Sequence, residues 1–398
     1  MKFALITSMN LPVPAFRGGA VENLVDMYLK YNKENAHHEF TVYTLQDTHH
    51  YDGTLLPDPY TKYVTINTNS LWYRCKNFIF RKTIGQYYSN GYWDFFLKEC
   101  LDRIQQEDYD LIIVENRGEF APRIKEVLGD KMPILFHMHN EFYAALHKLP
   151  EAKIIFSACD VSVCISDYIA DVVHQNLPTA ITETVFNGID EQRFKNVVPD
   201  YETFKVQKDD FIIAYSGRII QEKGVKELIQ AIKLCQDIPR LKLLIIGGSS
   251  YGLGNEQLYM SEVRELAEEL RDIVIVTGFV SYENVPSILA TANIVVVPSL
   301  WEEPAGLSAI EPLHLGKPMI VTKSGGIPQM TGDAAIIVEK NIDRLPQLLA
   351  DNIHLLYNNP EKREGLKQAA LIRSLRFTSE VYAKNMIAIM EKYAKRKV

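Results

Sequence analysis

The sequence predicts an α/β protein built from two domains, each with a parallel sheet. Short runs rich in Val, Ile, Leu and Phe alternate with amphipathic stretches, as expected for strands that crossover helices bury on both faces. This alternation stops once, in a polar stretch around residues 191–210, and then restarts. The chain has 398 residues, of which 47% are hydrophobic and 23% charged, so it is long enough for two cores.

The expected strands follow the apolar runs. In the first half they are 3–7, 40–44, 111–114, 134–139, 161–165 and 184–186, and in the second half 211–216, 241–246, 273–277, 294–298, 319–322 and 335–338. We therefore expect a Rossmann-like domain over 1–187 and a second over 188–376, facing each other across a cleft. Such sheets bind ligands beyond the carboxyl ends of their strands.

Charge and cysteine content narrow the classes of partner. The formal net charge is −7 with both signs mixed along the chain, which argues against a nucleic-acid partner. The five cysteines are odd in number and lack a C-x-x-C spacing, so we expect reduced, buried thiols in a cytoplasmic protein. The apolar run at 1–8 is too short for a signal peptide, and no run approaches the ~20 residues of a membrane span. Any membrane contact, on the inner face of the cell membrane, would be peripheral.

The segment 71–98 interrupts the alternation with ten aromatic residues among cations such as Arg74 and Lys76. Two interpretations remain open. An amphipathic surface could rest on anionic lipid or hold a lipid-linked acceptor. Alternatively, the segment forms core helices whose Lys and Arg side chains reach the solvent along their apolar stems.

The strongest chemical pattern is the segment 301–311, which follows the strand expected at 294–298. Glu303 falls in the strand-to-helix turn and Glu311 more than one turn into the helix. Carboxylates accept hydrogen bonds from sugar hydroxyls, and the backbone N–H groups of Gly306 and Leu307 would face an anionic diphosphate at the helix start. Taken alone, two glutamates in a helix would more often be a helix-start charge and a solvated residue.

Two cations follow the first strand of the second domain. Arg218 and Lys223 lie in the segment 217–224, at the same expected sheet edge. A diphosphate leaving group gains negative charge as its bond to the sugar breaks, so fixed cations stabilise the transition state more than the ground state. A surface ion pair is the simpler alternative.

The first domain has its own candidates at strand ends. Arg17, Gly18 and Gly19 form a glycine turn before the helix expected at 21–31, where backbone can approach a ligand closely. His137 and His139 end a strand on one face, but no third ligand with metal-site spacing is evident. The D-x-D pattern at 108–110 precedes a strand, which places it at the wrong end of the sheet for a ligand site.

These motifs together resemble the retaining glycosyltransferases of the GT-B fold, a family that includes bacterial capsule and lipopolysaccharide sugar transferases. The E-x7-E signature of that family matches Glu303 and Glu311, and further matches fall at 18–19, 139, 187–190, 217–218, 223–224 and 325–326. The resemblance implies that Glu303 contacts the donor sugar and Glu311 the ribose. It also implies donor phosphates at 218 and 223, the nucleotide base at the backbone near Val280, and His139 beside the sugar.

The resemblance implies transfer from a nucleotide-sugar co-substrate, with UDP-sugars favoured and no cofactor, to a saccharide or lipid-linked acceptor. Because the D-x-D pattern lies at the wrong end of the sheet, we expect no metal requirement. It also implies that the C-terminal stretch 377–398 packs back on the first domain. A nucleotide-sugar sensor without catalysis and a phosphorylase or epimerase of the same fold remain alternatives. Pro312, where the family has a helix former, predicts a kink or a late helix start, and Gln329 replaces a common Glu. We expect Arg218, Lys223, Glu303 and Glu311 to converge on one hollow.

Overall fold

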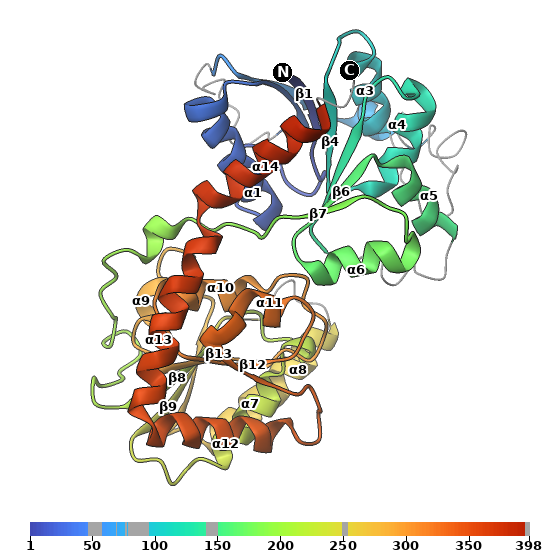
Figure 1. Cartoon of the computed structure of the whole chain (residues 1–398). Helices are drawn as coiled ribbons and strands as arrows, with labels where there is room; N and C mark the ends of the chain where they lie inside the picture. Colours follow the sequence, from blue (N-terminus) through green and yellow to red (C-terminus); the bar gives the residue numbers. More distant parts are fainter. Residues whose placement is uncertain are drawn as a thin grey trace. The chain divides into compact units, whose positions relative to one another are not determined.

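The computed structural model describes residues 1–46, 58–68, 70–75, 78, 95–140, 150–248 and 254–394. The chain forms two compact units (Figure 1). The first consists of Met1–Gly188 together with Ser379–Val398, and the second of Ile189–Thr378. Each unit is an α/β domain with one parallel sheet, as the sequence predicts.

The sheet of the first unit has the strand order β3-β2-β1-β4-β5-β6-β7, and all of its pairs are parallel. Its strands are β1 Lys2–Ile6, β2 Glu39–Leu45, β3 Thr61–Ile66, β4 Leu111–Glu115, β5 Ile134–Met138, β6 Val161–Cys164 and β7 Thr182–Thr184. The sequence analysis missed β3. It is a half-buried edge strand in which Lys62 and two threonines interrupt the apolar run, so the composition of a buried strand is lacking.

Helices cover both faces of this sheet. They are α1 Ala20–Tyr31, α3 Phe95–Ile104, α4 Ala121–Leu128, α5 Pro150–Ala158, α6 Asp167–Asn176 and α14 Ser379–Ala394. The C-terminal helix α14 lies beside α1, where Tyr382, Met386 and Met390 are buried in one cluster with Tyr28 (Figure 1). The end of the chain therefore completes the core of the unit in which the chain begins.

The sheet of the second unit has the order β10-β9-β8-β11-β12-β13, also parallel throughout. Its strands are β8 Phe211–Ser216, β9 Leu241–Ile246, β10 Val274–Gly278, β11 Ile294–Val297, β12 Met319–Thr322 and β13 Ala335–Val338. Its helices are α7 Val225–Lys233, α8 Gly254–Glu269, α9 Val285–Leu289, α10 Leu307–His314, α11 Ile327–Thr331, α12 Leu345–Asn358 and α13 Pro360–Ser374.

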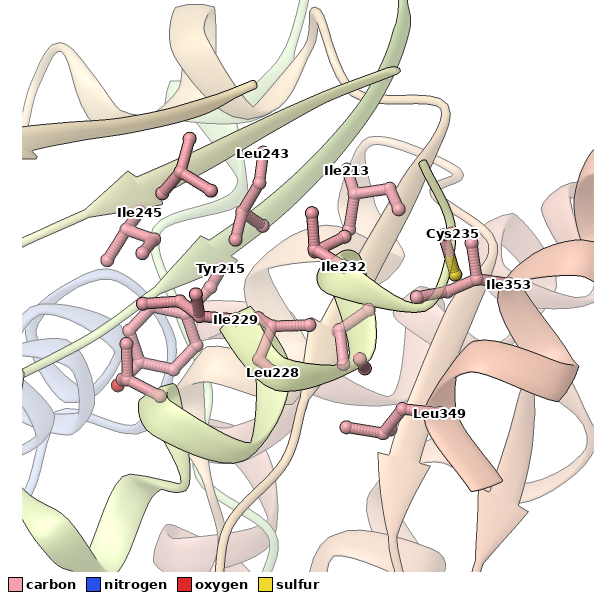
Figure 2. Packing of buried hydrophobic residues seen from close by; sticks show 14 of the residues in the cluster. Ile213, Tyr215, Leu228, Ile229, Ile232, Cys235, Leu243, Ile245, Leu349 and Ile353 are labelled. Atoms are coloured by element: carbon pink, nitrogen blue, oxygen red, sulfur yellow. The ribbon is translucent and has the colours of Figure 1, made fainter. Parts of the chain in front are cut away.

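The core of the second unit lies between its sheet and helices α7 and α12. Leu228 and Ile232 of α7 pack with Ile213 and Leu243 of the sheet, and Ile353 of α12 lies beside Cys235 (Figure 2). The buried residues of α7, such as Val225, Leu228 and Ile232, follow one another at intervals of three to four residues, which is the spacing of one helix face. The buried face of α7 holds the β8–α7 loop, and with it Lys223, at the edge of the sheet.

Two sequence expectations need correction, whereas the position of the D-x-D pattern is confirmed. Helix α10 begins at Leu307 and continues through Pro312 to His314, so the late start is wrong, whereas the kink stays a prediction. Pro312 has no N–H for the carbonyl four residues earlier, and the helix ends two residues after it. The thiol of Cys75 is exposed, unlike the buried Cys100, Cys164 and Cys235. Asp110 lies at the amino end of the sheet and accepts a hydrogen bond from the Lys2 N–H at 2.8 Å.

The aromatic segment 71–98 is described only in part. Tyr73 and Phe95 are buried in the core of the first unit, whereas Leu71, Trp72 and Phe78 are exposed. Part of the segment therefore belongs to the core, as one interpretation expects, whereas lipid contact by the exposed side chains stays a prediction. Phe96 is buried as well, whereas residues 76, 77 and 79–94, including Lys76, lie outside the described residues. Among the described helices, none is both long and apolar enough to cross a membrane.

Candidate active site

The centre of the candidate site in the second unit is a buried ion pair. Glu303, in the loop between β11 and α10, is 4% exposed, and its Oε1 atom pairs with Nζ of Lys223. The hydroxyl of Ser299 donates a hydrogen bond to the same oxygen. Lys223 follows β8, which pairs directly with β11 in the sheet. Residues far apart in the sequence meet here because neighbouring parallel strands end at one edge.

Backbone contacts hold this loop in place. The N–H of Gly326 donates to the carbonyl of Glu303 at 2.7 Å. Gly325 has a φ of +49°, and a Cβ on it would lie 2.2 Å from that same carbonyl oxygen. Only glycine allows both the left-handed conformation and the close approach. The loops after β11 and β12 are thus fastened to each other directly beside Glu303.

The adjacent acid, Glu302, has a different role. Its carboxylate accepts a hydrogen bond from the N–H of Gly325 and pairs with Lys340. Glu302 therefore braces the glycine turn, whereas Glu303 keeps one carboxylate oxygen, Oε2, without a hydrogen-bond partner in the described part of the chain. The sequence analysis did not distinguish these two acids by role.

Arg218 lies close to the same site. Its side chain is exposed, and its carbonyl accepts a hydrogen bond from the hydroxyl of Tyr215 at 2.6 Å. Burial raises the pKa of Tyr215 well above its usual range, the charge of Glu303 raises it further, and Arg218 opposes the shift. The Tyr215 phenol thus lies within electrostatic range of both Arg218 and Glu303.

Glu311 has a cationic partner that the sequence analysis missed. Nη1 of Arg193 lies 3.9 Å from Oε1 of Glu311, and the guanidinium stacks 3.2 Å from the ring centroid of Tyr282. Burial raises the pKa of Glu311 to about 7, and Arg193 offsets only part of that shift. Arg193 follows the motif at 187–190 by three residues, so the available signal was a cation beside a motif already recognised.

The remaining candidates of the second unit occupy strand ends without such direct contacts. Gly306 precedes α10 with a φ of +66° and no side-chain cap, and a Cβ on it would lie 3.9 Å from Cβ of Glu303. The first N–H groups of α10, including that of Leu307, therefore lie beside Glu303. Val280 follows β10, which is separated from β8 by β9. No hydrogen bond or ion pair between described residues joins Val280 to the Glu303 loop.

In the first unit, a buried network surrounds Glu115 at the end of β4. The hydroxyl of Tyr28 donates to Oε1 of Glu115 at 2.9 Å, and Nδ1 of His137 and Nε2 of His139 lie 3.0 and 2.8 Å from Oε2. Burial alone would raise the pKa of Glu115, but the charge and hydrogen bond of His137 and the hydrogen bond of His139 lower it below its usual range. Burial, aided by His137, lowers the pKa of His139 to about 4.

Glu115, His137 and His139 are also the group of described residues that could hold a metal ion, since their ligand atoms lie within 4.8 Å of one another. The sequence analysis found no third ligand because it examined spacing along the chain. Glu115 ends β4, which pairs with the strand β5 that carries both histidines. An inspection of every strand end would have found it.

The glycine turn at 17–19 begins α1. Gly18 and Gly19 have φ angles of +73° and +101°, and a Cβ on Gly19 would lie 2.2 Å from Oε2 of the buried Glu22. The hydroxyl of Ser8 donates to the other oxygen of Glu22 at 2.7 Å. The side chain of Arg17 is exposed. The turn is therefore as tight as predicted, and a carboxylate of the chain itself lies at the start of the helix.

Comparisons with known proteins agree with this architecture. The family described as Glycosyltransferase Family 4 matches residues 21–193, and the family described as Glycosyl transferases group 1 matches residues 200–373. The chain therefore belongs to the glycosyltransferases of group 1, with the GT-B fold. The two matched segments divide at the boundary between the two units.

Individual relatives share a quarter or less of their residues with the chain, or slightly more. The chain is 25% identical to spore coat protein SA of Bacillus subtilis over 98% of this chain and 100% of that protein. It is 26% identical to a lipopolysaccharide 1,2-N-acetylglucosaminetransferase of Salmonella typhimurium over 58% and 59% of the two chains. HepE of Anabaena, solved in complex with UDP, superposes with a TM-score of 0.74 at 17% identity over 98% of this chain and 100% of that one. At that identity the likeness concerns the fold.

Proposed function

We propose that this glycosyltransferase transfers a sugar from a UDP-sugar to a saccharide or lipid-linked saccharide with retention of anomeric configuration and without a metal. The observation that carries the proposal is the buried Lys223–Glu303 pair beside the uncapped start of α10. It combines a cation for the diphosphate with a carboxylate whose Oε2 is available to a sugar hydroxyl. The UDP and UDP-glucose complexes of HepE support uracil as the base.

The roles of the charged groups follow from the change in charge during the reaction. The bond between the anomeric carbon and the diphosphate oxygen breaks, and negative charge grows on the diphosphate. Arg218 and Lys223 stabilise that charge, assisted by the N–H groups at Gly306 and Leu307. Glu303 holds the sugar, Glu311 the ribose, and the backbone near Val280 the base.

Retention is proposed to proceed by attack of the acceptor on the face from which the diphosphate leaves. Glu115 is the buried carboxylate nearest to His139 in the first unit, but three donors occupy it, so it is unsuited to act as a nucleophile. His139 orients the sugar, and the turn at Arg17, Gly18 and Gly19 lies on the acceptor side. The exposed Leu71, Trp72 and Phe78 suit peripheral contact with the membrane that carries a lipid-linked acceptor.

Thermal stabilisation by nucleotide sugars tests the donor. We expect UDP-sugars to raise the melting temperature more than GDP- or dTDP-sugars, since ligand at 100 times its Kd adds about 2.7 kcal/mol to stability. A second assay measures release of UDP with a saccharide acceptor, with and without EDTA, and the anomeric configuration of the product by NMR. Inverted product, loss of turnover in EDTA, or stabilisation by another base alone would each contradict the corresponding part of the proposal.

A further inference from the structure

The carboxylate of Glu115 determines where the protons lie in the buried network of the first unit. Glu115 is fully buried and accepts contacts from Tyr28, His137 and His139 at 2.9, 3.0 and 2.8 Å. An ionised carboxylate has no proton to donate. Each atom that faces it must therefore carry the hydrogen.

The two histidines use opposite nitrogens for this contact. His137 faces Glu115 with Nδ1, and His139 faces it with Nε2. A neutral imidazole carries one N–H, so in His139, whose pKa burial lowers to about 4, the lone pair remains on Nδ1. Nε2 of His137 is buried without a partner. Nδ1 of His139 is not among the buried atoms that lack a partner, and no described residue forms a hydrogen bond to it.

We propose that Glu115 is a positioning residue that holds His139 in the Nε2–H tautomer, so that Nδ1 accepts a hydrogen bond from a hydroxyl group of a substrate. The role of His139 beside the sugar rests on the proposed function. In this tautomer Nδ1 cannot donate to a phosphate oxygen, so His139 selects a hydroxyl and leaves the diphosphate to the cations of the second unit.

The same distances argue against a metal at this cluster. Two ligand atoms bound tetrahedrally to zinc at about 2.0–2.2 Å would lie about 3.3 Å apart. The Glu115 oxygen lies 2.8 Å from His139 and 3.0 Å from His137, which are distances of charge-assisted hydrogen bonds. A proton, rather than a metal, fits between each pair of atoms.

Nitrogen NMR of the wild-type protein tests the tautomer directly. Protein labelled with ¹⁵N-histidine should show His139 with a protonated Nε2 and an unprotonated Nδ1 at neutral pH, the signal being assigned by its loss in His139→Gln. A protonated Nδ1 would overturn the proposal, and so would stoichiometric zinc in the purified protein. This measurement needs no change to Glu115, so it remains decisive even where a variant of Glu115 fails to fold.

Glu115→Gln tests the consequence for catalysis. The neutral amide removes the negative charge that favours an N–H on each facing nitrogen, so the preference of His139 for the Nε2–H tautomer should weaken. We expect kcat to fall roughly 10- to 100-fold, below the 10²–10⁴-fold contribution of a positioned acid or base, with KM for the donor changed less than 3-fold. The control is Asp210→Asn, which neutralises a buried acid bound to Arg240 in the second unit and should retain kcat.

The outcomes separate the two proposals. An unchanged kcat in Glu115→Gln, or an unchanged His139 tautomer in that variant, would overturn the positioning role. Wild-type protein that turns over no nucleotide sugar would contradict the proposed function instead. In that case the ¹⁵N spectrum still decides whether Glu115 sets the proton on His139.

Discussion

Glu115 of the first unit and Glu311 of the second are both largely removed from water, but their pKa values shift in opposite directions. Three donors surround Glu115, and two of them, His137 through its charge and hydrogen bond and His139 through its hydrogen bond, lower its pKa despite complete burial. Glu311 has Arg193 at 3.9 Å, beyond hydrogen-bond distance, and burial raises its pKa to about 7. Burial alone therefore does not decide the charge of an acid; the number and distance of its donors do.

Glu303 has two partners, the ammonium of Lys223 and the hydroxyl of Ser299, and both contact the same carboxylate oxygen. Both carboxylate oxygens of Glu115 therefore accept contacts from the protein itself, whereas Glu303 and Glu311 can still accept hydrogen bonds from a ligand. Each prediction below tests whether the second unit differs from the first in this way.

The largest effect should come from Glu303→Gln. The amide keeps the size of the side chain but loses the charge that pairs with Lys223, so kcat should fall about 100- to 1,000-fold, equivalent to about 3–4 kcal/mol of transition-state stabilisation. Steady-state kinetics with a UDP-sugar measure this. The exposed Glu339→Gln is the control and should retain wild-type kinetics; equal kinetics for both variants would remove Glu303 from the site.

Lys223→Met should destabilise the protein without any ligand. It leaves Glu303, at 4% exposure, without its cation, and we expect a loss of about 2–4 kcal/mol in urea denaturation, near the range for broken buried pairs. Lys233→Met is the matched control, because its pair with Glu269 is more than half exposed on both sides, and its loss should stay below about 0.5 kcal/mol. Similar losses for the two variants would mean that the Lys223–Glu303 pair is no more than a surface contact.

Gly325→Ala tests the backbone that holds Glu303. An alanine there would have to keep the left-handed backbone conformation, and its Cβ would lie 2.2 Å from the carbonyl oxygen of Glu303. We therefore expect stability to fall by about 2 kcal/mol or more and kcat to be reduced. Gly365→Ala, in helix α13 with nothing within 4 Å, should instead stabilise by about 0.5–1 kcal/mol. A neutral Gly325→Ala would show that the loop after β11 adjusts freely.

Glu311→Gln should change stability in a pH-dependent manner. The unfolded carboxyl ionises near 4.5 and the folded one near 7, so the folded state binds more protons between these values and wild-type stability falls as pH rises through them. The variant lacks this loss and should gain about 2–3 kcal/mol relative to wild type between pH 5 and pH 8. Urea denaturation at both pH values measures it. The exposed Glu361→Gln should differ from wild type by the same amount at both pH values. If the stability difference between Glu311→Gln and wild type were also the same at pH 5 and pH 8, the raised pKa of Glu311 would be refuted.

Much of the fold was accessible from the sequence because parallel strands buried on both faces are continuous apolar runs. The expected ranges match β8, β9, β12 and β13 residue for residue. The edge strand β3 was missed because one of its faces is half-exposed and its composition is mixed. The start of α10 was misjudged because Pro312 was given more weight than the short length of the helix.

The candidate residues were also accessible from the sequence, since glycines, acids and cations directly follow the strands at which ligands bind. Their partners were not. Glu115 meets His139 because β4 and β5 are neighbours in the sheet, and Lys223 meets Glu303 because β8 pairs with β11. Strand order, and not spacing along the chain, decides these contacts. The sequence alone thus determines which charged groups follow which strands. Only the tertiary structure determines their pairings and pKa values, because these depend on burial and on donors that other strands bring close.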